Sequence, residues 1–245
     1  MLKRLVKNFL KKQGYEITNI SRRSGYPLYA METSFPAIAS KCKHLILGDW
    51  HKMFSVYSAV NYISEYDIPG DLVECGVYKG GMTKLMAYTL LENNCKRKIY
   101  LYDTFKGHVV EPTGLDINYT GALAMERYKN AGGWCSAGLD EVKNNMFSTG
   151  HSKENIVFVE GEVNKTIPDT IPEKISLLRI DVDLYEATLH ILEHLFPRLS
   201  KNGVLIIAAY GHWKGTKTAI DKYFKENNIL MFRGRATGSM VGVKV

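Results

Sequence analysis

Two acidic residues, Asp181 and Asp183, stand at the end of a largely apolar run that begins at Ile175. An apolar run without alternation predicts a strand buried on both faces, and therefore a parallel sheet covered by helices on both sides. Acids at the carboxyl end of such a strand lie in the crevice where open α/β sheets bind ligands. Asp183 could instead cap the helix that follows, but capping leaves Asp181 unexplained. Both carboxylates are therefore candidates for ligand binding or proton transfer.

A second group of candidate residues surrounds a glycine-bearing turn. Gly76, Gly80 and Gly81 allow a ligand to approach the backbone at the start of a helix, although they lack the Gly-x-Gly-x-x-Gly spacing of dinucleotide sites. Glu74, just before the turn, would repel phosphate and would suit an ammonium or a sulfonium. Asp103 ends the next predicted strand and is placed to accept hydrogen bonds from ribose hydroxyls. Together these residues favour S-adenosylmethionine over NAD; a strand-end Glu and a helix-capping Asp are the structural alternatives.

The elements that must position these residues alternate along the chain. We predict strands at residues 72–75, 98–103, 156–160, 175–181 and 203–207, helices at 51–65, 83–91, 139–147, 185–199 and 216–227, and a final strand pair at 229–232 and 239–244. Strands separated by helices of this length predict the α/β class with a doubly wound, mostly parallel sheet.

Two segments stand outside this alternation. Residues 1–50 are expected to form an N-terminal extension or cover segment, and residues 51–245 the ligand-binding domain. Within the extension, residues 2–12 predict a basic amphipathic helix, which we expect to pack on its own domain or a partner subunit, with peripheral membrane contact as the alternative. Residues 104–137 are too long for an ordinary connection and predict a functional lid.

Composition limits the class of protein. The chain has 245 residues, a net charge of +7 and 45% apolar residues, as expected for a globular domain with a sizeable core. The positive charges form no stripe beyond the N-terminus, so no nucleic-acid partner is expected, whereas an anionic substrate is compatible. The four cysteines lack zinc-site spacing, and free thiols indicate a cytoplasmic protein. We also expect a homo-oligomer. No apolar run has transmembrane length.

Four motifs, in this order, resemble those of the macrocin (TylF-type) O-methyltransferase family. They read Val73-Glu-Cys-Gly-Val-Tyr-Lys-Gly-Gly81, Tyr102-Asp-Thr-Phe105, Leu178-Arg-Ile-Asp-Val-Asp-Leu-Tyr-Glu186 and Tyr210-Gly-His-Trp213. The resemblance runs from about Met53 to the C-terminus. It implies a Rossmann-like class I methyltransferase fold with a helical N-terminal extension and a lid insertion. It also implies S-adenosylmethionine as donor, a bound Mg²⁺, and a sugar hydroxyl, on a polysaccharide or a natural product, as acceptor.

The resemblance also implies roles for individual residues. The methionine part of the donor would lie against Glu74, Gly76, Gly80 and Gly81, the ribose at Asp103 beside Phe105, and the adenine at Gly161 and Glu162. Asp181 matches a metal ligand near the donor, and Asp183 matches the proposed general base. His212 lies near this site by sequence and is a candidate to contact the substrate or to replace Asp183 as the base.

One departure from the family concerns the metal. Ala208 and Ala209 stand where the family has two adjacent acids, the other metal positions beside Asp181. Because hard cations need oxygen ligands, Mg²⁺ binding should be weak or absent, while the donor site should survive. Either deliberate substitution of the two acids or natural divergence would explain the two alanines. Because both positions are changed together, deliberate substitution is favoured. We expect slow turnover or none. The alternative functions are a catalytically silent donor-binding protein and a catechol-like small-molecule O-methyltransferase.

Several aromatic and basic residues remain. Trp213, Lys214, Tyr119 and Trp134 are candidates to line a pocket for a sugar or an anionic glycan, with loop anchoring as the alternative. His190 and His194 are four residues apart on a predicted helix. Because they lack the Glu of a zincin motif, we interpret them as a partly exposed helix face.

Overall fold

The computed structural model describes residues 28–31, 33–109, 111–130, 135–236 and 238–245. Compactness divides the chain into residues 1–36 and residues 37–245. The sequence predicts a boundary at residue 50. The compact unit begins earlier because residues 45 and 46 already pack on it. A Cβ added at Gly81 would lie 2.4 Å from Ile46 Cγ1. The helix predicted at residues 2–12 lies outside the described residues.

A seven-stranded sheet is the centre of the larger unit. Its strands are β1 (Asp71–Cys75), β2 (Ile99–Asp103), β3 (Ile156–Glu160), β4 (Ile175–Ile180), β5 (Leu199–Ile207), β6 (Arg233–Ala236) and β7 (Ser239–Val243). Their order is β3-β2-β1-β4-β5-β7-β6, with β7 antiparallel to its neighbours. The first five strands are parallel. The predicted α/β class and doubly wound, mostly parallel sheet are confirmed.

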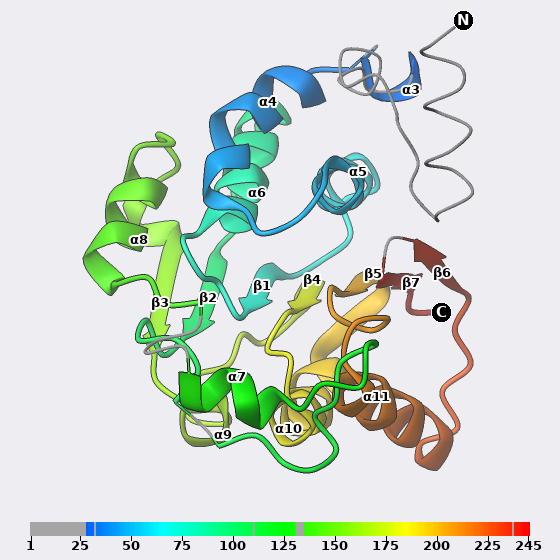
Figure 1. Ribbon diagram of the computed structural model, residues 1–245. Coiled ribbons are helices and arrows are strands. Elements are labelled where there is room, and N and C mark those ends of the chain that lie inside the picture. Colours follow the sequence, from blue (N-terminus) through cyan, green and yellow to red (C-terminus); the bar gives the residue numbers. More distant parts are fainter. Residues whose placement is uncertain (1–27, 32, 110, 131–134, 237) are drawn as a thin grey trace, which may run out of the picture. The chain divides into compact units, whose positions relative to one another are not determined.

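Helices cover both faces of this sheet (Figure 1). One face carries α5 (Trp50–Glu65), α6 (Gly81–Glu92) and α8 (Leu139–Phe147), and the other carries α9 (Val163–Thr166), α10 (Tyr185–Leu195) and α11 (Lys214–Glu226). The remaining helices are α3 (Leu28–Met31), α4 (Phe35–Cys42), α7 (Ala124–Asn130) and the short 3₁₀ turns η1 (Lys43–Leu45), η2 (Lys153–Asn155) and η3 (Phe196–Arg198). Strand β4 is buried along its whole length, which explains its apolar sequence. Among the described residues, no helix is both long and apolar enough to cross a membrane.

The prediction of a strand at residues 229–232 is wrong. The strand that pairs with β7 is β6, which comes directly before the tight turn at Gly238 (φ +79°). Because the turn fixes the register, the pairing residues must be those next to it. Leu230 and Phe232 are instead 86% and 88% exposed, so their apolar character reflects a surface loop and not a strand.

The predicted lid segment is more ordered than its sequence indicates, since it includes α7 and a small bridge between Ile117 and Leu123. Asp116 anchors it. Its Oδ1 accepts a hydrogen bond from the backbone N–H of Tyr185 (2.8 Å), the first residue of α10, and its Oδ2 accepts one from the N–H of Thr113 (2.7 Å). A buried carboxylate from the lid thus caps a helix of the main fold.

The turn after β1 is the most constrained point of the sheet edge. Gly76 has φ +85°, and a Cβ there would lie 2.3 Å from the carbonyl oxygen of Asp181. We expect Gly76→Ala to lower the free energy of unfolding by about 2 kcal/mol or more, because both the left-handed conformation and the contact penalise a side chain. Gly114→Ala, where nothing lies within 4 Å, is the matched control. Urea unfolding of both variants measures the difference; equal values would contradict this account.

Candidate active site

A cavity of about 430 Å³ opens at the carboxyl ends of the parallel strands. Of the residues that the sequence singles out, those lining it are Glu74, Gly76, Gly81, Asp103, Gly161, Glu162, Asp181, Asp183, Ala208, Ala209, His212 and Trp213. They come from the ends of five neighbouring strands, β1 to β5, and from the loops that follow. The fold therefore gathers into one place residues that lie up to 139 positions apart in the sequence, from Glu74 to Trp213.

Gly80 and Phe105 are not in the lining. Gly80 is the N-cap of α6, in the left-handed conformation (φ +78°), where a Cβ would lie 3.1 Å from Val142. Phe105 is buried, with its ring centroid 6.4 Å from that of Phe158. Both residues shape the walls of the cavity from behind.

Asp103 holds the glycine turn in place. Its Oδ2 accepts hydrogen bonds from the backbone N–H groups of Val77 (2.6 Å) and Tyr78 (3.0 Å), and its Oδ1 accepts one from Phe105 (2.9 Å). The carboxylate therefore has a structural role, but it holds the turn before α6 and does not cap the helix, as the alternative to ribose binding had it. The two roles are compatible, because a carboxylate has about four acceptor positions and Asp103 also lines the cavity.

A chain of three charges crosses the cavity floor. The guanidinium of Arg179, which is 3% exposed, donates to Oε1 of Glu74 and to Oδ2 of Asp181, the latter at 2.8 Å. Burial raises the pKa of Glu74 to about 7 and outweighs the opposing effect of Arg179. Glu74 Oε2 is buried and, among the described residues, has no hydrogen-bond partner. An acceptor atom buried beside the glycine turn is therefore left for a donor on a ligand.

Asp183 has a different neighbour. Its backbone is in the left-handed region (φ +66°), and its Oδ2 lies 3.9 Å from Nε2 of His108, which comes from the lid. Both side chains are largely buried and both line the cavity. His108 was not predicted from the sequence, because nothing local distinguishes a loop histidine 75 residues before its partner. The pair can hold and move a proton.

The alanine pair lies at the end of β5. Ala208 and Ala209 are 2% and 5% exposed. The backbone carbonyl of Ala208 accepts hydrogen bonds from Ser239 Oγ (3.1 Å) and from Nζ of Lys52 (3.3 Å), a residue at the start of α5. Lys52 also lines the cavity, and no sequence pattern predicts this position for it. A cation thus lies at the end of β5.

The residues proposed for a sugar pocket separate into two groups. Trp213 lines the cavity and is 2% exposed. Tyr119 and Lys214 are outside the lining, and Tyr119 is 73% exposed. The backbone N–H of Tyr119 donates to the carbonyl of His212 (2.9 Å), so this residue anchors a loop. Trp134 lies outside the described residues.

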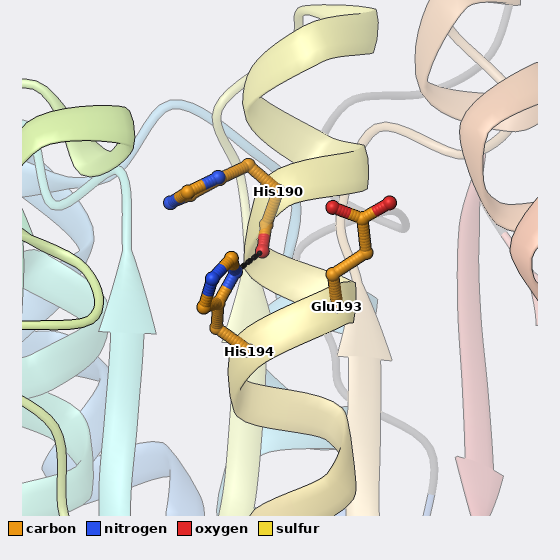
Figure 2. Close-up of side chains that lie close together, drawn as sticks. All are labelled: His190, Glu193 and His194. Atoms are coloured by element: carbon orange, nitrogen blue, oxygen red, sulfur yellow. Dashed lines mark hydrogen bonds between the residues drawn. The ribbon is translucent and has the colours of Figure 1, made fainter.

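His190, Glu193 and His194 form a separate group on α10. Their ligand atoms lie within 4.8 Å of one another, but one nitrogen of each ring contacts a backbone carbonyl, at 2.9 Å in both cases. The rings lie 4.2 Å apart, tilted by 36°, and Figure 2 shows Glu193 turned away from them. Imidazole lone pairs lie in the ring plane, so rings placed face to face direct them past each other. As arranged, this group is the partly exposed helix face expected from the sequence.

Comparison with known proteins agrees with this geometry. Residues 36–232 match the profile of the family described as Macrocin-O-methyltransferase (TylF). A demethyldecarbamoylnovobiocin O-methyltransferase of Streptomyces niveus is 29% identical over 74% of this chain and 67% of its own length. An 8-demethyl-8-(2,3-dimethoxy-α-L-rhamnosyl)-tetracenomycin-C 4'-O-methyltransferase of Streptomyces olivaceus is 33% identical over 58% of this chain and 54% of its own length. The structure of the O-methyltransferase NovP is similar over 79% of both chains, with a TM-score of 0.70 and 25% identity.

The chain of charges formed by Glu74, Arg179 and Asp181 leads to a prediction about stability. Arg179→Met leaves Glu74 buried without its cation, a change that typically costs about 3–5 kcal/mol. We expect a larger loss at pH 8 than at pH 6, because the variant raises the Glu74 pKa further and folding then requires a bound proton that becomes scarce as pH rises. Urea unfolding at both pH values measures this. The double variant Glu74→Gln/Arg179→Met should recover part of the loss at pH 8; equal losses at both pH values would refute the account.

Proposed function

Because the chain belongs to the macrocin O-methyltransferase family, we propose that it transfers a methyl group from S-adenosylmethionine to a hydroxyl of a sugar, on a polysaccharide or a glycosylated natural product. The fold, that of class I methyltransferases, supports the donor. The acceptor class is supported by the rhamnosyl group in the name of one relative.

The observation that carries the proposal is the unpartnered Oε2 of Glu74 beside the glycine turn. A buried carboxylate oxygen there fits the ammonium of the donor's methionine part, which would satisfy it. The backbone at Gly76 and Gly81 would approach the same part, because both glycines line the cavity. The remaining acceptor positions of Asp103 would bind the ribose, and Gly161 and Glu162 would lie beside the adenine.

When bound, S-adenosylmethionine supplies an electrophilic methyl group. The protein's own residues prepare the acceptor oxygen. Asp183 and His108 would take the proton of the acceptor hydroxyl, with the carboxylate holding the imidazole in orientation. Trp213 gives the cavity an apolar wall against which a sugar ring can pack. Closing the cavity with the lid segment would exclude water from the reacting oxygen.

The donor set does not fit magnesium. Asp181 is already paired with Arg179, and the neighbouring positions are the methyl groups of Ala208 and Ala209. A dication beside a guanidinium, with so few oxygens free, would be poorly bound. We therefore assign no step to Mg²⁺. The origin of the alanine pair stays a hypothesis, as do the cytoplasmic location, the homo-oligomer and membrane contact by the N-terminal helix.

Two other functions compete with this proposal. The alanine pair favours a catalytically silent donor-binding protein, and the small cavity favours a catechol-like acceptor. Uptake of labelled methyl from S-adenosylmethionine separates them, using nucleotide sugars, rhamnosides, oligosaccharides and phenols as acceptors. Uptake by sugars supports the proposal, uptake by phenols alone supports the second alternative, and donor binding without uptake supports the first.

Donor affinity should depend on pH through Glu74. S-adenosylhomocysteine carries the same amino-acid ammonium, which stays protonated through neutral pH. Since the pKa of Glu74 is raised to about 7, its carboxylate is charged mainly above that pH. We therefore expect calorimetric affinity to fall as the pH drops below about 7. The variant Glu74→Gln should abolish the fall in affinity at low pH, and Glu226→Gln, an exposed control, should retain it. A fall in affinity at low pH that persists in Glu74→Gln would contradict the role of this residue.

The proton acceptor can be identified by substitution. For whichever acceptor takes up methyl in the screen, Asp183→Asn should lower kcat by roughly 100-fold, the lower range for general base catalysis. Its affinity for S-adenosylhomocysteine should stay within twofold, because the residue does not face the donor's ammonium. His212→Gln should cost less. The reverse order would make His212 the base, and Asp140→Asn, on the exposed start of α8, serves as control.

A further inference from the structure

Lys52 occupies the end of the cavity that the alanine pair leaves without acids. It lies in the first turn of α5, where its backbone N–H donates to the N-cap residue Asp49 (3.2 Å). Its Nζ crosses to the end of β5 and donates to the carbonyl oxygen of Ala208 (3.3 Å). A Cβ at Gly48 would lie 3.2 Å from Lys52 Cδ, so the stem of the side chain is confined. The ammonium is therefore held at this strand end.

The ammonium keeps capacity for a ligand. It has three N–H donors, and the hydrogen bond to Ala208 uses one of them. Among ion pairs between residues that the structure describes, none within 4.0 Å includes Lys52. Asp181, which also lines the cavity, is paired with Arg179 instead. Lys52 thus offers a positive charge to whatever fills this part of the cavity.

We propose that Lys52 takes the place of the divalent cation in this chain and polarises the acceptor hydroxyl, so that methyl transfer needs no metal. The proposal deepens the function proposed above and rests on it. It also changes the expectation of an inactive chain into one of metal-independent turnover. In the step itself, the acceptor's O–H bond breaks and its proton passes to the Asp183–His108 pair. The oxygen forms the new bond to the methyl carbon, and the electron pair of the broken carbon–sulfur bond stays on sulfur. Lys52 keeps its protons throughout.

The physical argument is one of charge. A fixed donor aimed at an oxygen that gains negative charge in the transition state typically contributes 10²–10³-fold in rate. Lys52 can supply such a donor, and it also repels a dication from the same place. With carboxylates at positions 208 and 209, a dication would no longer be repelled. The acids would either pair with Lys52 or bind a metal ion that competes with Lys52 for them.

The test uses Mn²⁺ as the probe, with the full chain saturated with S-adenosylhomocysteine. Calorimetry should detect no Mn²⁺ binding at millimolar concentration in the chain with Ala208 and Ala209. Ala208→Asp/Ala209→Asp should bind it, and adding Lys52→Met to that variant should raise the affinity at least tenfold, because a like charge is removed. Adding Lys201→Met, an exposed lysine outside the cavity, is the control and should change nothing. Tight Mn²⁺ binding by the unmodified chain, or no effect of Lys52→Met, overturns the proposal.

A second measurement uses the acceptor found by methyl uptake. In EDTA the rate should be unchanged, Lys52→Met should lower kcat roughly 100-fold, and Lys52→Arg should retain most of it, with affinity for S-adenosylhomocysteine unchanged. A rate that requires added Mg²⁺ would leave the methyltransferase function standing and refute the role of Lys52. Failure to bind S-adenosylhomocysteine at all would refute the function itself. If no acceptor is found, the Mn²⁺ titration decides alone.

Discussion

The site depends on one buried guanidinium between two carboxylates. Arg179 and Glu74 are direct partners in the parallel register of β4 and β1, so their side chains meet on the same face of the sheet. Asp181 stands two residues beyond Arg179 and shares that face, which lets one guanidinium contact both acids. Arg179 and Glu74 are 3% and 1% exposed, and neither charge would be tolerated alone at this depth. The sheet register therefore fixes the charge chain, and the charge chain explains why a charged residue interrupts the apolar strand β4.

The same register determines what surrounds the end of β5. Ile180 of β4 pairs with Ile207 of β5, so Asp181 and Ala208 come next to each other where the strands end. Two acids at 208 and 209 would have gathered with Asp181 around a common point. In this chain the point is bordered by two methyl groups, an acid that already has a partner, and the ammonium of Lys52. The charge beside the end of β5 is therefore that of an ammonium.

Much of this arrangement could be predicted from the sequence. Apolar runs located the five parallel strands, and their ends gave Glu74, Asp103 and Asp181, because strand ends in such folds meet at one edge. The pairing of Glu74 with Arg179 was missed, because it depends on register between strands more than 100 residues apart. Lys52 and His108 were missed for the same reason, as each comes from a helix or loop that only tertiary packing brings to the cavity. The prediction of a strand containing Leu230 and Phe232 was wrong, because apolar residues in an exposed loop can have the same sequence pattern as a strand.

The distribution of charge in the cavity matches the direction of methyl transfer. Glu74 and the other strand-end acids lie beside the glycine turn, where a cationic donor would be attracted, and Arg179 compensates only part of their charge. Lys52 lies at the other end, by β5, where an oxygen would become more negative as its proton leaves. When the methyl group moves, the positive charge on sulfur disappears, so the attraction that held the donor weakens in the product. A lysine at the end of β5 would therefore favour loss of the acceptor's proton, and the weaker attraction at the other end would favour release of the demethylated donor.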